Sequence, residues 1–248
     1  MTTVNISFLI LCFLQLYSTK NLPSHFPRCN LTDPNINKCM LEATEKMKPY
    51  LAKGVPELNL PPFEPFYMPE LSFEQGTPAI NLKATLKDIL MHGMTDYTFS
   101  KFEFDVPNLQ FFGHAIFKGI KMEGKYDLHG KILAVPLDGS GTFNCTIDNC
   151  RTTVHQKTKL ITRKGEKYLD ISFTNTTMHI GKTRTQLNGL FGDNKELAEV
   201  TNKLINDNAD ELFGEIQPVL EQVMTNLLND VILGAFIRQI PYDKLYLK

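Results

Sequence analysis

The middle of the chain alternates apolar and polar residues over long stretches. The clearest runs have apolar side chains at Phe102, Phe104 and Val106, and then at Ile120, Met122, Tyr126 and Leu128. A period of two is typical of strands that bury one face. We therefore expect long antiparallel strands from about residue 71 to residue 187, and their apolar face needs a cover.

Two residue pairs that end in glycine are expected hairpin turns, His129–Gly130 and Lys164–Gly165. A turn at His129–Gly130 places Leu133 and Phe143 on the inward face of the strand that follows. Asn144 then faces solvent, because neighbouring residues of a strand point to opposite sides.

A second pattern, with apolar residues every three or four positions, covers residues 197–236. It indicates one amphipathic helix of about 40 residues, or roughly 60 Å. Asp193–Asn194 can cap its start, and Pro241 stops it. Pro218 should kink the helix or mark a break near Gly214. This long helix is the expected cover of the sheet.

A short amphipathic helix is expected after Cys39. The next segment carries four prolines within residues 61–69, which excludes a helix and predicts extended chain at a sheet edge. Its aromatic residues, Phe63, Phe66 and Tyr67, must pack on the molecule or bind a partner.

Together these elements predict an α+β fold, in which a strongly curved antiparallel sheet wraps one long C-terminal helix and a short N-terminal helix is added. No linker or change of composition divides the chain, so we expect residues 19–248 to form a single domain.

The N-terminus reads as a signal peptide. Residues 6–16 are an apolar run that is too short to cross a bilayer, and Met1 to Ser18 contain no charged side chain. We expect cleavage near Ser18, and the alternative is a buried strand or helix. No later run is long and apolar enough to span a membrane, so the expected product is secreted and soluble.

Secretion makes disulfides possible, and four cysteines follow residue 18. Cys29 and Cys39 enclose a short loop rich in Asn, Asp and Pro, which can bring their sulfurs together. Cys145 and Cys150 are five steps apart, so on an unbroken strand they lie about 16 Å apart on opposite faces. They can pair only if Asp148–Asn149 forms a turn or bulge, and the alternative is two buried thiols.

Three glycosylation sequons are present in the secreted part, at Asn30, Asn144 and Asn175. Each is an acceptor only where it is exposed.

Charge argues against several classes of partner. Lys and Arg total 26 and Asp and Glu total 27, a formal net charge of −1. A nucleic-acid binder needs a surplus of basic charge, and so does a protein that adheres to anionic membranes.

Catalytic chemistry is not indicated either. The sequence has no Gly-x-Ser-x-Gly elbow, its acidic residues are scattered, and none of its six histidines forms a zinc-binding pair. We therefore expect no catalytic residue, no metal site and no cofactor.

The chain is rich in adaptable apolar side chains, with 17 Phe, 8 Tyr and 9 Met but no Trp. Such residues fill an irregular core or line an apolar cavity, and pattern does not separate the two. The candidate cavity residues come from the inward strand positions and from one face of the long helix: Phe102, Phe104, Met122, Tyr126, Leu133, Phe143, Val223, Met224, Leu227 and Leu228.

An ordered set of short motifs resembles the takeout and haemolymph juvenile-hormone-binding family of insect secreted proteins, and it covers essentially the whole secreted chain. The set consists of Leu22-Pro23-Ser24, the Cys29 and Cys39 pair, Lys48-Pro49-Tyr50, residues 54–58, Pro69-Glu70-Leu71-Ser72, residues 123–141, residues 187–208 and residues 240–245.

The resemblance implies a curved sheet around a long helix and an internal tunnel for a terpenoid hormone, a fatty-acid-like lipid or a similar apolar signal. It also implies a link of some members to circadian output and feeding. Two departures matter. The long helix has no cysteine for the second disulfide of the hormone carriers, and Ala209 stands where many takeout-like relatives carry Trp. The first departure favours a takeout-like member.

The expected function is therefore a secreted carrier of a small hydrophobic ligand, monomeric, present in extracellular fluid and recognised by an extracellular receptor or carrier partner. The alternative is an extracellular interaction protein with a vestigial pocket, for which the aromatic segment at residues 63–67 is the expected contact. A lipid-ester hydrolase is disfavoured because no nucleophile motif is present.

Overall fold

The computed structural model describes residues 20–76, 80–133 and 135–247. The expected signal peptide, residues 1–18, lies outside the described residues. In the described part, no helix is both long and apolar enough to cross a membrane.

The described residues form one antiparallel sheet of seven strands. The strands are β1 (Phe66–Gly76), β2 (Ile80–His92), β3 (Tyr97–Asp105), β4 (Gln110–Ile132), β5 (Val135–Arg163), β6 (Glu166–His179) and β7 (Thr183–Asn188). β4 and β5 are by far the longest, with 23 and 29 residues, and they pair with each other along their length.

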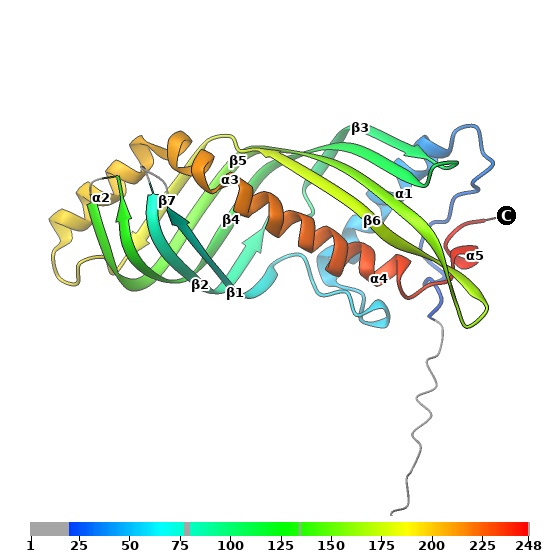
Figure 1. The fold of residues 1–248 in the computed structure, drawn as a ribbon, viewed down its shortest axis with the longest axis horizontal. Coiled ribbons are helices and arrows are strands. Elements are labelled where there is room, and N and C mark those ends of the chain that lie inside the picture. The colour runs from blue at the N-terminus through cyan, green and yellow to red at the C-terminus, as the bar shows by residue number, and fades with distance from the viewer. Residues whose placement is uncertain (1–19, 77–79, 134, 248) are drawn as a thin grey trace, which may run out of the picture.

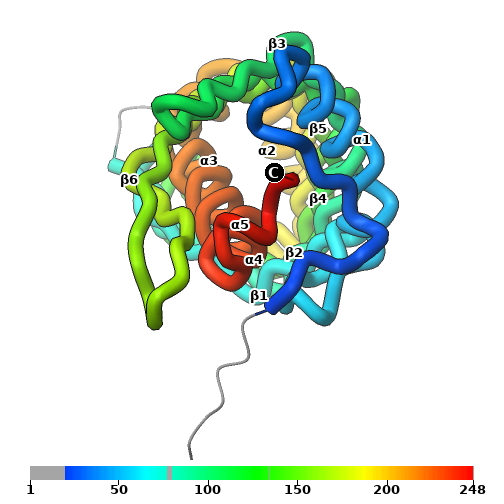
Figure 2. Tube along the Cα trace, turned by 90° about the vertical axis from the view of Figure 1, so that its right-hand side faces the viewer, coloured from blue at the N-terminus to red at the C-terminus, as the bar shows by residue number. Residues whose placement is uncertain are grey.

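The two long strands organise the sheet because each carries two shorter partners on its other edge. β3 pairs with the first half of β4 and β2 with the second half. β7 pairs with the first half of β5 and β6 with the second half. The sheet stays unclosed, with β1 beside β2 at one end of the order and β6 at the other. It curves into an elongated roll (Figure 1; Figure 2).

Of the two expected hairpin turns, Lys164–Gly165 is confirmed, with φ angles of 51° and 82° between β5 and β6. The turn at His129–Gly130 is wrong, because β4 continues through both residues and the chain reverses after Ile132. Gly130 lies inside β4, where the absence of a side chain lets β2 approach closely and pair with it. A side chain there would place its Cβ 2.2 Å from the carbonyl oxygen of Asn81.

The correction moves Leu133 out of the strand and into the turn, where its φ is 53°. Phe143 is buried as expected, and Asn144 is exposed.

The helices are α1 (Ile36–Lys53), the short 3-10 turn η1 (Pro56–Leu58), α2 (Lys195–Asp207), α3 (Ala209–Asn226), the wide-turn segment η2 (Leu227–Ile232), α4 (Leu233–Ile237) and α5 (Tyr242–Leu245). α2, α3, η2 and α4 make up the expected long C-terminal helix, and α3 to α4 run along the roll (Figure 1). Asn194 caps α2 as expected, with its side-chain oxygen accepting from the Leu197 N–H.

The break in the long helix lies at Asn208 and not near Gly214, and Pro218 is accommodated inside α3. The Asn208 backbone N–H and its side-chain Nδ2 both donate to the Leu204 carbonyl, at 3.2 and 2.8 Å. Asn208 thus satisfies a carbonyl of the last turn of α2, and the next residue, Ala209, begins α3.

α3 lies between the two separated edges of the sheet and bonds to both. On one side, Gln75 of β1 donates to the Glu215 carbonyl at 3.1 Å. On the other, Glu221 accepts from the Met178 N–H of β6 at 2.8 Å. The curved sheet therefore wraps the helix, and the helix bridges the gap that the sheet leaves open.

Candidate functional site

An apolar cavity of about 370 Å³ lies in one half of the roll. Its walls come from α1, β3, the first half of β4, the second half of β5 and the helix from Met224 to Ile237. The volume falls in the range of small-molecule sites in proteins, roughly 300–1,000 Å³.

The lining is strongly apolar. Phenylalanines on β3 and β4 form one wall, and their rings pack edge to face, with centroids of Phe99 and Phe102 5.2 Å apart. Methionines of α1 and the leucines of the long helix form the facing walls. None of the described residues that line the cavity is Asp, Glu, Lys or Arg. Such a lining suits an uncharged, flexible apolar guest.

The structure places five of the ten sequence-predicted site residues in this lining: Phe102, Phe104, Met224, Leu227 and Leu228. The other five lie elsewhere. Met122, Tyr126 and Phe143 belong to the packed core, Leu133 is in the turn after β4, and Val223 on α3 lies outside the lining.

The division follows from what fills each half of the roll. Around Tyr126 and Phe143, the interior is occupied by side chains of β2, β7 and α2, and the Tyr126 hydroxyl donates to the Asn188 carbonyl at 2.9 Å. In the other half, β3 and α1 face the long helix across a space that side chains do not fill, and this space is the cavity.

Sequence reasoning missed several members of the lining. The main ones are Met40 and Met47 on α1, Tyr97 and Phe99 on β3, Phe111 and Phe117 on β4, and Thr152 and Gln156 on β5. Thr152 and Gln156 were missed because an unbroken alternation along β5, with odd-numbered residues facing inward, places even-numbered residues outside. Asp148 and Asn149 are both exposed, and Asn149 has a φ of 56° although the register between β4 and β5 does not shift there. Beyond this point the inward positions of β5 change from odd to even numbers.

The segment η2 shapes the helical wall. Its hydrogen bonds span five residues, as in a π-helix, and this wider turn presents Leu227, Leu228 and Ile232 to the cavity. Its Asn229 bonds to β5 and β6. Wide turns of this kind often occur at functional sites.

Glu64 fixes another part of the wall. Its carboxylate accepts from the Gly93 N–H at 2.9 Å, the Thr95 N–H at 2.8 Å and the Thr95 hydroxyl at 3.0 Å. These bonds tie the proline-rich segment to the β2–β3 connection. Phe63 and Thr95 both line the cavity, so Glu64 positions two of its residues.

Two tyrosines, Tyr97 and Tyr246, belong to the lining. Burial, with a smaller contribution from Glu45, raises the pKa of Tyr97 to about 12. Burial, and secondly Tyr242, raises the pKa of Tyr246 as well. Both groups therefore stay protonated and neutral at physiological pH.

The cysteines separate into one pair and two thiols. A disulfide joins Cys29 to Cys39 with the Cα atoms 5.9 Å apart, and Cys29 lines the cavity. Cys145 and Cys150 are free and buried. Both point inward because the inward positions of β5 change from odd to even numbers at Asp148–Asn149, but no bond joins them. Burial raises the pKa of each thiol.

The three sequons differ in exposure. Asn144 and Asn175 are exposed on β5 and β6. Asn30 is half-buried, and its side-chain oxygen accepts from both the N–H and the hydroxyl of Thr32.

The aromatic segment at residues 63–67 does not form an exposed contact surface. Phe63 and Phe66 are buried and stacked, with ring centroids 5.0 Å apart. Tyr67 is exposed and donates to the Asp88 carboxylate at 3.1 Å. The extended edge strand expected for this segment is confirmed, because Phe66 begins the edge strand β1.

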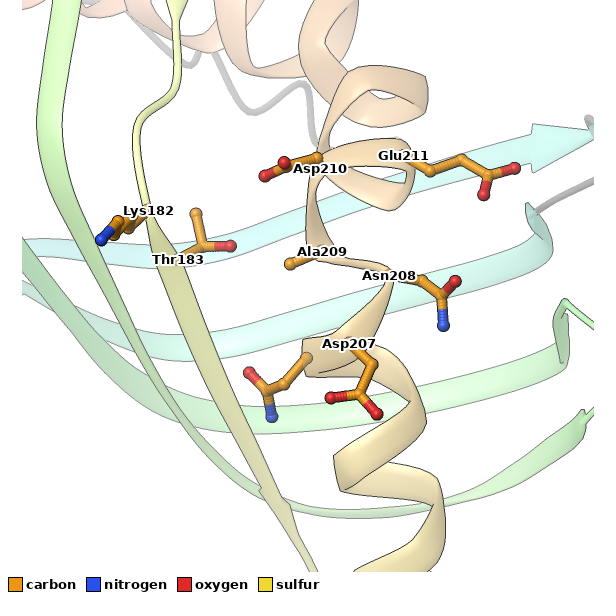
Figure 3. Close-up of a pocket in the computed structure, with 8 residues that line it drawn as sticks. Lys182, Thr183, Asp207, Asn208, Ala209, Asp210 and Glu211 are labelled. Carbon is orange, nitrogen blue, oxygen red and sulfur yellow. The ribbon is translucent and has the colours of Figure 1, made fainter.

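A second hollow of about 440 Å³ lies where α2 meets α3, close to the start of β7. Its lining residues are polar except for Ala209, and Asn208 and Glu211 point away from Lys182 and Thr183 (Figure 3). The side chains do not converge on a common point. The apolar cavity is therefore the better candidate for a binding site.

Comparison with known proteins agrees with this geometry. A family model described as haemolymph juvenile hormone binding protein matches residues 7–247. The circadian clock-controlled protein daywake of Drosophila melanogaster is 24% identical over 245 residues, which cover 93% of this chain and 90% of that protein. Its counterpart in Drosophila yakuba is 24% identical over 243 residues, covering 92% and 90%.

Among solved structures, Takeout 1 of Epiphyas postvittana superimposes with a TM-score of 0.76 at 19% identity. The match covers 90% of this chain and 100% of that one. It shows the same fold, a curved antiparallel sheet around a long helix.

Proposed function

The chain belongs to the haemolymph juvenile hormone binding protein family, and on that premise we propose that it is a secreted carrier that holds one small hydrophobic ligand in the apolar cavity. The observation that carries this proposal is the cavity itself, about 370 Å³ in volume and lined by described residues without charge.

The mechanism is reversible burial of apolar surface in a site that is formed before the ligand enters. Each methylene group removed from water contributes about 0.8 kcal/mol, which is roughly a fourfold gain in affinity. Affinity should therefore rise with chain length until the cavity is full, and no chemical step is involved.

Secretion is part of the proposal. We assign residues 1–18 to a signal peptide and residues 19–248 to a single domain, with the Cys29–Cys39 disulfide formed in an oxidising compartment. Asn144 and Asn175 are the sequons best placed for a glycan because they are exposed. The carrier acts as a monomer in extracellular fluid and delivers its ligand to an extracellular partner.

The name of the daywake relatives favours a role in circadian physiology. We propose that the ligand is a terpenoid, a fatty-acid-like lipid or a similar apolar signal whose transport follows that rhythm.

A substitution that fills the cavity tests the proposal. Met224 lies on α3 and lines the cavity, so Met224→Trp should occupy space that the ligand needs. We expect this variant to lose most of its capacity for a fluorescent fatty acid or a fluorescent terpenoid, measured by titration.

The matched control is Gln222→Trp, which adds the same side chain to the exposed face of the same helix. It should bind as the unsubstituted protein does. Equal capacity in a folded Met224→Trp variant would contradict the assignment of this helix face to the binding site.

A further inference from the structure

Gln156 is a buried polar side chain in an otherwise apolar wall. It lies on the inward face of β5, is 5% exposed and lines the cavity. Its cross-strand partner on β4 is Phe111, and Val154 precedes it on the same face. A buried amide must satisfy its hydrogen bonds or lose free energy, so its partners define what it can offer a ligand.

Both N–H groups of Gln156 are engaged. Nε2 donates to the Thr174 hydroxyl oxygen and to the Asn229 side-chain oxygen, each at 3.2 Å. The Thr174 hydroxyl donates in turn to the same Asn229 oxygen at 2.8 Å. The network therefore joins β5, β6 and η2, and it uses every donor that the Gln156 amide has.

The side-chain carbonyl oxygen of Gln156, Oε1, has no hydrogen-bond partner in the described part of the chain, although the side chain lines the cavity. Gln156 thus offers the cavity an acceptor and no donor. The group that satisfies it must carry an O–H or N–H.

From this geometry we infer that the cavity selects an apolar alcohol, whose hydroxyl donates to Gln156 Oε1. The inference rests on the proposed carrier function and specifies its ligand class. An ether or ester of the same size has no hydrogen to donate and leaves Oε1 unsatisfied. A carboxylate also lacks a donor, and none of the described lining residues is a cation that would pair with it.

A second polar residue on the same strand does not offer its hydroxyl to a ligand. Thr152 lines the cavity and is 3% exposed, but its Oγ1 is itself fully buried and interacts with the Cys150 thiol. A threonine hydroxyl both donates and accepts, so it does not select between an alcohol and an ether.

The hydroxyl groups of Tyr97 and Tyr246 stay protonated because burial raises their pKa values, so each of them can both donate and accept. They do not select between an alcohol and an ether, which makes Tyr97 a useful counter-test.

The experiment compares dodecanol with undecyl methyl ether, which has the same number of non-hydrogen atoms, by displacement of a fluorescent fatty acid. The quantity measured is the ratio of the two affinities in the unsubstituted protein and in Gln156→Met. Because the same two compounds are used throughout, their different solubilities cancel. We expect the alcohol-to-ether ratio to fall about three- to tenfold in Gln156→Met, as for the loss of one hydrogen bond.

Gln75→Met is the matched control. Gln75 also donates from β1 to the long helix but lies outside the cavity lining, so the ratio should not change. Retained binding of undecyl methyl ether by Gln156→Met shows that its cavity is intact. Where that binding is lost, the ratio is measured instead in Asn229→Asp and Thr174→Val, and it should stay high because Oε1 is kept.

Three results would overturn the inference: an unchanged ratio in Gln156→Met, an equal fall in Gln75→Met, or a fall in Tyr97→Phe in place of Gln156→Met. These results leave the carrier function standing, because both compounds still bind. Failure of dodecanol, undecyl methyl ether and dodecanoate alike to displace the probe would instead contradict the carrier function itself.

Discussion

Tyr97 places an ionisable group in the apolar wall of the cavity. Its ring packs edge to face with Phe99 at 5.5 Å, and Lys48 Nζ lies 4.5 Å from the ring centroid. Lys48 is itself paired with Glu45. Burial is the largest cause of the raised pKa of Tyr97, because a phenolate would lose its hydration.

This raised pKa predicts a specific alkaline instability. Below pH about 10 the folded and unfolded chains both hold the Tyr97 proton. From there to about 12 the unfolded chain releases it first, so the free energy of unfolding falls as pH rises. At pH about 11 the loss should be about 1.4 kcal/mol. The measurement is the free energy of unfolding in urea at pH about 9 and about 11. Between these two values, Tyr97→Phe should lose less stability than the unsubstituted protein by this amount. An identical loss in both proteins would contradict the assignment.

The lining also shows how far single residues can be predicted. Phe102, Met224 and Leu227 were selected as apolar residues on the correct face, and they do line the cavity. Tyr126 and Phe143 satisfy the same rule but are packed core. Periodicity reports which face is buried, whereas the difference between core and cavity depends on whether another element fills the space.

Two asparagine side chains on α2 bond to the backbone of β7 as a neighbouring strand would, because each bonds to both the N–H and the carbonyl of one residue. Asn202 accepts from the Leu187 N–H at 2.8 Å and donates to the Leu187 carbonyl at 2.9 Å. Asn206 makes the same pair of bonds to Thr185, at 2.8 and 2.7 Å. Their spacing of four residues on the helix matches the spacing of two on the strand, so α2 satisfies the open edge of β7. Covering an edge in this way prevents pairing with another chain.

Asn202→Leu should therefore be strongly destabilising. The substitution keeps the size of the side chain but leaves the Leu187 N–H and carbonyl buried without partners, at a cost of about 3 kcal/mol. Urea unfolding measures the difference. Asn226→Leu, at an exposed position of α3, is the control and should change stability by less than about 0.5 kcal/mol. Equal effects of the two substitutions would show that the bonds to β7 contribute little.

For the secondary-structure elements, the sequence predicted whether a segment is a helix or a strand more reliably than it predicted where that segment ends or breaks. The long helix and the extended proline-rich edge are confirmed, because periodicity and proline act locally. The break at Asn208 was not located, and the irregular backbone at Asp148–Asn149 was considered only as a condition for pairing Cys145 with Cys150. Each depends on a partner distant in the chain or on a side chain that bonds back to the backbone, which periodicity does not report.

The cavity occupies one half of the roll, and the C-terminal segment lies across that end of the molecule (Figure 2). Leu245 and Tyr246 line the cavity, and the Tyr246 ring stacks on Phe104 with centroids 6.3 Å apart. The Leu247 N–H donates to the Cys29 carbonyl at 2.9 Å, which fastens this segment beside the disulfide. The segment is therefore placed to slow the exit of a ligand.

Removal of residues 242–248 should speed that exit. Loss of the apolar contacts of Leu245 and Tyr246 with the ligand, about 1.5 kcal/mol, corresponds to roughly tenfold faster dissociation. Stopped-flow displacement of a fluorescent fatty acid measures the dissociation rate. Tyr242→Phe, which keeps the segment in place, should release ligand at the unaltered rate. A truncated protein that is folded and also releases ligand at that rate would show that exit follows another route.

The whole fold could be predicted because the curved sheet and the long helix each need the other to cover an apolar face. The position of the cavity could not be predicted from the same argument. It depends on α2 filling one half of the roll, while α1 leaves space in the other.

Native mass spectrometry of the protein secreted from insect cells tests the central claim most directly. We predict a species heavier by one small apolar molecule, released on extraction with organic solvent, or a protein that takes up one molecule of dodecanol per chain. A protein that is empty as secreted, and that stays empty after incubation with dodecanol, dodecanoate and a terpenoid alcohol, would contradict the assignment of a carrier function.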